Sequence, residues 1–245
     1  MSKYSPHFYL AFFLLLNIFN FIDRNLLIAF APEIKSDFNL TNVEWGLLTG
    51  VYFLFFYSVF GIFMGVLGDK FNRMKIAAAG VFLWSIMTAF TGMAKNFAHL
   101  IVARALIGVG ESALTPNSIS MLSDVYNQNK RGTASAIYYL GIPLGVGLAM
   151  LIASIFGPMF GWRAVFISLG LIGVVLAIIT YFLIEPIRGQ LDNVSQNDEK
   201  SMSIREIISL TKSTLYNSKS LTLIIVGSIF LHIPLGAGNF EVLWA

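Results

Sequence analysis

The stretch Gly65-Val-Leu-Gly-Asp69-Lys-Phe-Asn-Arg73-Met-Lys75 is a short charged interruption between two long apolar runs, residues 44–67 and 76–94. A run of roughly 20 apolar residues is long enough for a helix to cross the hydrocarbon core of a membrane, about 30 Å thick. The sequence therefore predicts a pair of membrane-spanning helices, with this charged turn at one membrane surface.

The rest of the chain has the same character, since 56% of its 245 residues are hydrophobic and 12% are charged, with a mean hydropathy of +0.74. A soluble domain carries about 25% charged residues, so a soluble enzyme, a disordered chain and a nucleic-acid-binding protein are excluded. Cysteine is absent, so the chain has no disulfide and no thiolate metal site. Further apolar runs predict spans at 8–31, 99–124, 134–157 and 162–184, and a seventh from about 221 to Ala245.

The basic residues indicate the orientation of these spans. With the 65–75 turn in the cytoplasm, eleven lysines and arginines lie on that side and three on the other, as the positive-inside rule requires. We expect a multi-pass protein of a bacterial inner membrane with a cytoplasmic N-terminus. Pro32 and the Asp23-Arg24 pair favour a retained first helix over a cleaved signal peptide.

The predicted domains are a six-helix bundle (1–184), a cytoplasmic linker (185–220) and the start of a further bundle (221–245). Ser203 and Glu206 have the spacing of a capping box, so the linker is expected to contain an interfacial helix. A plain solvated linker is the alternative.

Four ionisable residues lie within predicted spans: Asp23, Arg24, Arg104 and Glu111. Each costs about 2.5–3.5 kcal/mol at a helix centre, so they must face a polar cavity or one another. Asp23 lies about 12 Å and Arg104 about 9 Å from the outer surface, which predicts an ion pair between them. Glu111 shares the face of Arg104, whereas Arg24 points about 100° away from Asp23, to the cavity edge or a neighbouring helix. The alternative is that these charges only fix helix packing.

The 65–75 turn resembles the G-x-L-x-D-R-x-G-R-R/K signature of the major facilitator superfamily, with departures at Lys70 and Asn72. The stretches 104–111 and 185–188 resemble further motifs of that superfamily. Phe21-Ile-Asp-Arg24 and Gly141-Ile-Pro143 are similar to its spinster-like branch. The resemblance implies an all-α membrane protein whose first six helices form two inverted three-helix repeats. It also implies that the substrate lies between two six-helix halves, of which this chain contains one, truncated in helix 7. A half-transporter that dimerises is the alternative.

The turn is then expected to act as a conformational latch. Gly65 would allow close helix approach, Asp69 would face a helix N-terminus of the other half, and Arg73 would bridge to a second acid, for which we expect Asp124. In the fifth span, Gly141, Pro143 and Gly145 suggest either a hinge or close packing.

The function that follows is proton-coupled secondary transport of an amphipathic or organic anion such as a lysolipid. The Asp23–Arg104 pair would couple transport to protons, with Glu111 and Arg24 in the same cavity. The alternative is a sugar-acid or organic-anion:proton symporter. No phosphate-binding G-x-x-x-x-G-K-[ST] motif is present, and no nucleophile with a base suggests an enzyme. The expected partners are the substrate, protons, the bilayer and the other half, and we expect no cofactor, metal or nucleic acid.

Overall fold

The structure, a computed structural model, describes residues 4–189 without interruption and only isolated positions beyond them. These residues belong to one compact unit, Met1–Ser195. The predicted interfacial helix and the seventh span from residue 221 lie outside this continuously described stretch, so both stay predictions. Within it, every regular element is a helix.

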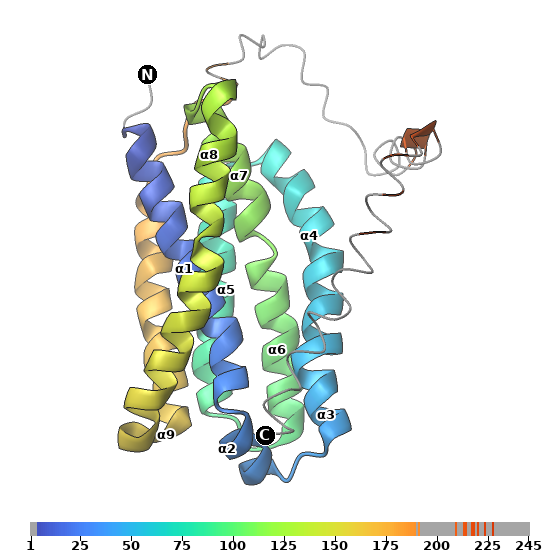
Figure 1. Cartoon of the computed structure of the whole chain (residues 1–245), viewed down its shortest axis with the longest axis vertical. Coiled ribbons are helices and arrows are strands. Elements are labelled where there is room, and N and C mark those ends of the chain that lie inside the picture. Colours follow the sequence, from blue (N-terminus) through green and yellow to red (C-terminus); the bar gives the residue numbers. More distant parts are fainter. Residues whose placement is uncertain are drawn as a thin grey trace. The chain divides into compact units, whose positions relative to one another are not determined.

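The first two spans are joined by two short helices (Figure 1). Helix α1 (Pro6–Ala29) begins where the Ser5 hydroxyl accepts a hydrogen bond from the Phe8 amide, with proline at its first position. Helix α2 (Ala31–Phe38) ends at Asn39, which adopts the left-handed conformation. A capping box of Thr41 and Glu44 then starts α3 (Asn42–Gly46), which continues through the π-helical turn η1 (Leu47–Val51) into α4 (Tyr52–Lys70).

The third span, α5 (Arg73–Gly92), follows the charged turn after Asn72 caps its first turn. The fourth span consists of α6 (Phe97–Glu111) and α7 (Leu114–Val125). The fifth begins with α8 (Gln128–Tyr139) and continues into α9 (Gly141–Phe182). Both interruptions follow from proline, whose ring clashes with the carbonyl four residues earlier: Pro116 destabilises the helix near Ser112, and Pro143 near Tyr139.

Helix α9 reverses its direction at Gly161, where φ is +76°, and so has a first and a second arm (Figure 1). Only glycine adopts this backbone conformation readily. Among the described residues, five helical stretches are long and apolar enough to cross a membrane, and the last, Gln128–Phe182, contains both arms. The two arms match the predicted fifth and sixth spans, so six crossings are accounted for, and the predicted all-α membrane fold is confirmed.

The helices alternate between two ends of the bundle. One end contains the start of α1, the α4–α5 turn and the residues after α9, and we call it the N-terminal end (Figure 1). The opposite end contains α2, α3 and the Gly161 bend. Helix α1 packs along α9, and α5 packs along both α9 and α6.

Glycines allow the closest of these approaches. A Cβ atom at Gly145 would lie 2.7 Å from the Ile18 carbonyl oxygen of α1, and one at Gly141 would lie 2.6 Å from Asn17 Nδ2. Both distances are too short for a side chain, so these glycines are where α9 lies directly against α1. The geometry favours the packing alternative for Gly141 and Gly145. A hinge at these glycines and Pro143 stays a prediction.

Candidate functional site

The four charged residues of the predicted spans gather in the middle of the bundle, and we call them the central charge cluster. Asp23 and Arg24 come from α1, whereas Arg104 and Glu111 come from α6, seven residues apart and therefore on nearly the same helix face. Asp23, Arg104 and Glu111 are buried, and the side chain of Arg24 is 21% exposed. Two cations and two carboxylates thus share one buried region.

Arg24 is held by Glu111 and by aromatic rings. Its Nε donates to Glu111 Oε2 in an ion pair that joins α1 to α6. The guanidinium carbon lies 4.6 Å from the ring centroid of Tyr57, 4.8 Å from Phe53 and 5.1 Å from Phe21. Cation–π contacts of this kind stabilise a charge that has lost part of its water. Arg24 therefore faces neighbouring helices, one of the two places expected for it.

Asp23 and Arg104 do not form the predicted direct ion pair. Asp23 Oδ1 accepts a hydrogen bond of 2.9 Å from the Thr88 hydroxyl of α5, and the Arg104 guanidinium lies over Phe53, 5.0 Å from its ring centroid. The prediction rested on matching depths, and the depth of a residue in a helix says nothing about the direction in which a long side chain extends. Residue Thr88 was not singled out from the sequence, because a lone threonine in an apolar run gives no signal.

Several polar atoms of the central charge cluster have no hydrogen-bond partner within the described part of the chain. Asp23 Oδ2, Glu111 Oε1, and Nε and Nη1 of Arg104 are buried and have no hydrogen-bond partner there. Buried charged groups in this condition are costly for stability. The arrangement therefore offers a free carboxylate oxygen for a proton and a free guanidinium edge for an anion.

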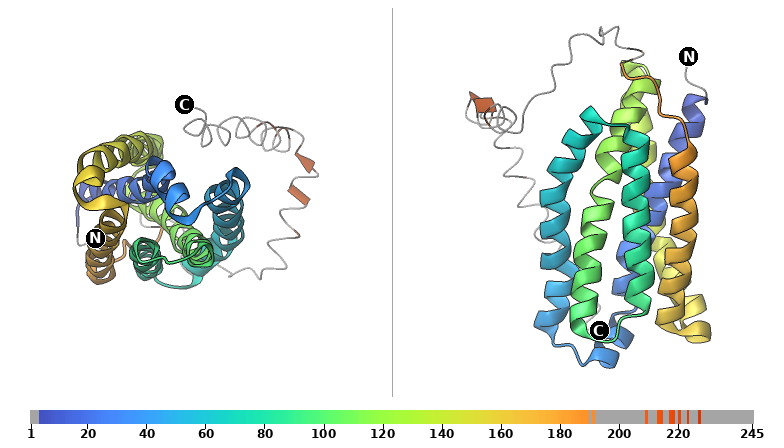
Figure 2. Two further views of the ribbon diagram at one scale, coloured as in Figure 1. Left: turned by 90° about the horizontal axis from the view of Figure 1, so that it is seen from below. Right: turned by 180° about the vertical axis from the view of Figure 1, so that it is seen from behind.

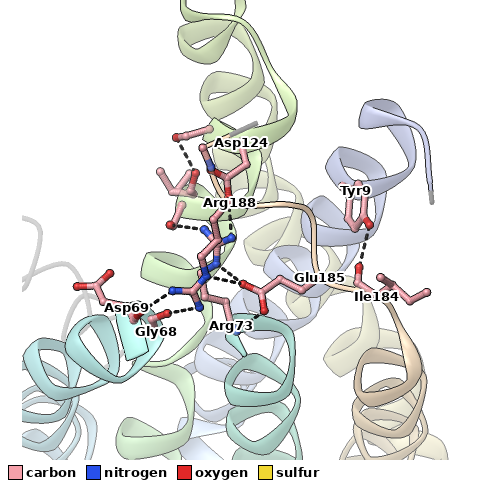
Figure 3. Close-up of polar contacts among 12 residues, drawn as sticks. Tyr9, Gly68, Asp69, Arg73, Asp124, Ile184, Glu185 and Arg188 are labelled. Carbon is pink, nitrogen blue, oxygen red and sulfur yellow. Dashed lines mark hydrogen bonds and ion pairs between the residues drawn. The ribbon is translucent and has the colours of Figure 1, made fainter. Parts of the chain in front are cut away.

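A second cluster lies at the N-terminal end, where α4, α5, α7 and the residues after α9 meet, and we call it the end cluster (Figure 3). Arg73 is at its centre. Its Nη2 lies 2.6 Å from Asp124 Oδ2, its Nε lies 2.6 Å from Glu185 Oε1, and its Nη1 donates to the Ser120 hydroxyl at 2.8 Å. The Arg73–Asp124 ion pair expected from the sequence is present.

Arg188 extends the end cluster to α4. It donates to the backbone carbonyls of Gly68, Asp69 and Phe71, at 2.9 Å in the case of Gly68, and its Nε lies 3.3 Å from Glu185 Oε1 (Figure 3). These carbonyls belong to the last turn of α4 and to its C-cap residue Phe71, where no intrahelical partner is available and a cation is favoured by the helix dipole. The sequence marked Glu185 and Arg188 as part of a motif, but their partners became visible only in the fold.

Two members of the predicted latch are not part of these contacts. The Asp69 side chain is exposed and forms no ion pair with any described residue (Figure 3). A Cβ atom at Gly65 would meet nothing within 4 Å, so within residues 4–189 Gly65 does not allow the close helix approach expected of it. The close approach in this turn is instead at Gly68, which is buried against Asn117 and Arg73. The latch role of Gly65, Asp69, Arg73 and Asp124 stays a prediction.

Comparisons with known proteins agree with this architecture. A family model described as the Major Facilitator Superfamily matches residues 13–240. The sphingosine-1-phosphate transporter SPNS2 of Danio rerio is 36% identical over 182 residues, which are 72% of this chain and 36% of that protein. A probable L-galactonate transporter of Escherichia coli is 29% identical, over 68% of this chain and 36% of its own length.

Among solved structures, a bacterial homologue of the human lysosomal transporter Spinster, in an inward-facing and unoccupied conformation, superposes with a TM-score of 0.71. The two are 32% identical, and the match covers 84% of this chain and 49% of the homologue. The chain thus spans about a third of the length of these two relatives and about half of the solved homologue.

Proposed function

Because the chain belongs to the Major Facilitator Superfamily, we propose that it forms part of a proton-coupled secondary transporter for an amphipathic organic anion. The central charge cluster is the observation that carries this proposal. Charged residues inside a membrane protein are expensive and mark substrate or ion pathways, and four of them converge here from α1 and α6.

The proton would be carried by Asp23. One of its oxygens already accepts the Thr88 hydrogen bond, and the other has no partner among the described residues. An ionised Asp23 attracts the Arg104 cation, whereas a protonated Asp23 leaves that cation to an anionic substrate. Arg104 would then pair alternately with the ionised Asp23 and with the substrate anion, so that protonation of Asp23 and substrate binding are coupled. Glu111 holds Arg24 beside this site and is the second acid of the cluster.

A lysolipid is the substrate class that the geometry supports best. Arg24 and Arg104 supply positive charge for a phosphate or carboxylate. The rings of Phe21, Phe53 and Tyr57 that surround Arg24 provide an apolar surface for the start of a lipid chain. The names of the spinster-related proteins to which this chain is similar point in the same direction.

A sugar-acid:proton symporter is the second candidate, and the similarity to the probable L-galactonate transporter favours it. A sugar acid has hydroxyl groups along its length and needs polar partners in place of an apolar surface. Buried atoms without a partner in the described chain, such as Asn20 Nδ2 and Ser118 Oγ, would serve it.

The remaining assignments belong to the same proposal. Residues 1–184 form a six-helix half of two inverted repeats, 185–220 a cytoplasmic linker, and 221–245 the start of a second half. The N-terminal end of the bundle faces the cytoplasm of a bacterial cell. The end cluster, with Asp69, acts there as a latch toward the second half.

The test is uptake by the complete protein that carries this sequence, purified into proteoliposomes with an imposed pH gradient. We expect saturable uptake of labelled sphingosine-1-phosphate that a protonophore abolishes. Saturable, protonophore-sensitive uptake of L-galactonate alone would select the sugar-acid alternative. A conductance that does not saturate with substrate would indicate a pore and overturn the proposal.

A further inference from the structure

A groove on the outside of the bundle runs between α5 and the second arm of α9, which lie side by side (Figure 2, right). Its volume is about 270 Å³. Its lining residues are Lys75, Ala78, Ala79, Phe82, Ala177, Ile178 and Tyr181. Ala78 and Ala177 are buried, and the other five are exposed. The groove is separate from the central charge cluster, which lies between α1, α4 and α6.

The groove opens at the level where its two helices reach the N-terminal end. Lys75 is two residues after the start of α5, and Tyr181 is one residue before the end of α9. Lysine and tyrosine at the ends of membrane helices mark the boundary between lipid and water. From Lys75 the groove follows α5 to Phe82, a depth of about 10 Å at 1.5 Å per residue, so it extends into the hydrocarbon region.

The charge at the mouth of the groove is available to a ligand. Lys75 is exposed and forms no ion pair with any residue in the described chain. Its Nζ lies 5.6 Å from the ring centroid of Tyr181, which orients the ammonium group above the groove. The neighbouring Arg73 already forms ion pairs with Asp124 and Glu185. Lys75 is therefore the cation that an anionic group at this mouth would meet.

We propose that this groove binds one anionic phospholipid of the surrounding leaflet, with the headgroup phosphate on Lys75 and the start of an acyl chain against Ala78, Ala79 and Ala177. Both helices are long and apolar enough to span a membrane, so acyl chains are what the outer face meets. The lysine adds a preference for an anionic headgroup, because basic residues at the membrane surface attract anionic lipids. The ligand would be a structural or regulatory lipid, distinct from any transported substrate.

Native mass spectrometry of the full chain, with added phosphatidylglycerol or phosphatidylcholine, tests this proposal. We expect one phosphatidylglycerol to bind more tightly than phosphatidylcholine, and Lys75→Gln to weaken its binding about fivefold, as the loss of one surface cation predicts. Ala79→Trp, at an exposed position of the lining, fills the groove and should remove the bound lipid whatever its headgroup. Glycerol phosphate, which has the headgroup without chains, should not compete.

Lys130→Gln is the matched control, because Lys130 is also exposed at the N-terminal end but does not line the groove. Its phosphatidylglycerol binding should equal that of the unmodified chain. Equal binding of the two lipids, or equal losses in Lys75→Gln and Lys130→Gln, would overturn the proposal. Retained binding in Ala79→Trp would place the lipid elsewhere and overturn it too.

Discussion

Replacement of Arg73 by methionine should destabilise the bundle by breaking the end cluster. Arg73 is buried and pairs with two carboxylates that are themselves nearly buried, Asp124 and Glu185. Removal of one partner from a buried ion pair costs about 3–5 kcal/mol. The lower value, about 3 kcal/mol, applies here, because Glu185 keeps Arg188 at 3.3 Å and Asp124 keeps the Gly189 amide at 2.9 Å. At about 2–4 °C per kcal/mol for a domain of this size, Tm should fall by about 6–12 °C.

The intrinsic fluorescence of the four tryptophans reports this unfolding in detergent. Lys70→Met is the control, since it removes a neighbouring exposed cation that forms no ion pair with a described residue. It should change Tm by no more than about 1 °C. Arg73→Lys should be intermediate, because a lysine keeps the charge but not the planar fork that reaches both acids and Ser120. If Arg73→Met has the same Tm as Lys70→Met, the end cluster does not stabilise the packing of these helices.

Three further predictions concern other parts of the bundle. Gly145→Val should lower Tm, because forcing α1 away from α9 costs about 1–3 kcal/mol of stability. Gly147→Val is the control and should not lower Tm, because an added Cβ there meets nothing within 4 Å. Equal effects of the two substitutions would refute the packing role of Gly145. At the opposite end, hydrogen bonds from Trp162 and Arg163 lower the pKa of Asp37. The ionised Asp37 therefore contributes to the free energy of unfolding, by less than about 1 kcal/mol at this exposed site. This contribution is present above about pH 4 and is lost as the pH falls through the lowered folded pKa. The difference in Tm between Asp37→Ala and the unmodified chain should therefore vanish in acid. A difference that persists there would exclude the ion pair as its cause. Asp69→Asn should raise labelling of single cysteines placed at positions accessible in the inward-open state of a cysteine-free version of the complete protein. Residues 1–245 themselves contain no cysteine to replace. Unchanged labelling on both sides would discard the latch.

The membrane fold was predictable because hydrophobic length alone identifies a span. Each of the first six predicted runs reappears as a helical stretch within residues 4–189. Gly161, which lies between two of these runs, is where α9 reverses. The interruptions at Ser112 and Leu140 were not predicted. Each interruption depends on a single proline ring, and one proline does not change the hydropathy pattern from which a span is predicted.

The members of the central charge cluster were predictable but their pairing was not, whereas the Arg73–Asp124 pair of the end cluster was predicted. Ionisable residues in apolar runs must converge somewhere, so Asp23, Arg24, Arg104 and Glu111 were identifiable from burial cost alone. The arithmetic of helix rise gives their heights and not their directions, which is why Arg24 contacts Glu111 where Asp23–Arg104 was expected. The reach of a guanidinium across helices depends on neighbours such as Phe53, and these become known only from the fold.

Uptake of labelled sphingosine-1-phosphate by proteoliposomes of the complete protein, with Asp23 intact and with Asp23→Asn, tests proton coupling most directly. The asparagine resembles the protonated carboxyl, so it should abolish accumulation driven by a pH gradient and leave substrate exchange at equal pH measurable. Arg104→Ala should lose both activities, because in the proposed mechanism the substrate anion and the ionised Asp23 pair in turn with that cation. Accumulation by Asp23→Asn with an unchanged pH dependence would contradict the coupling role of Asp23 and point to Glu111 instead.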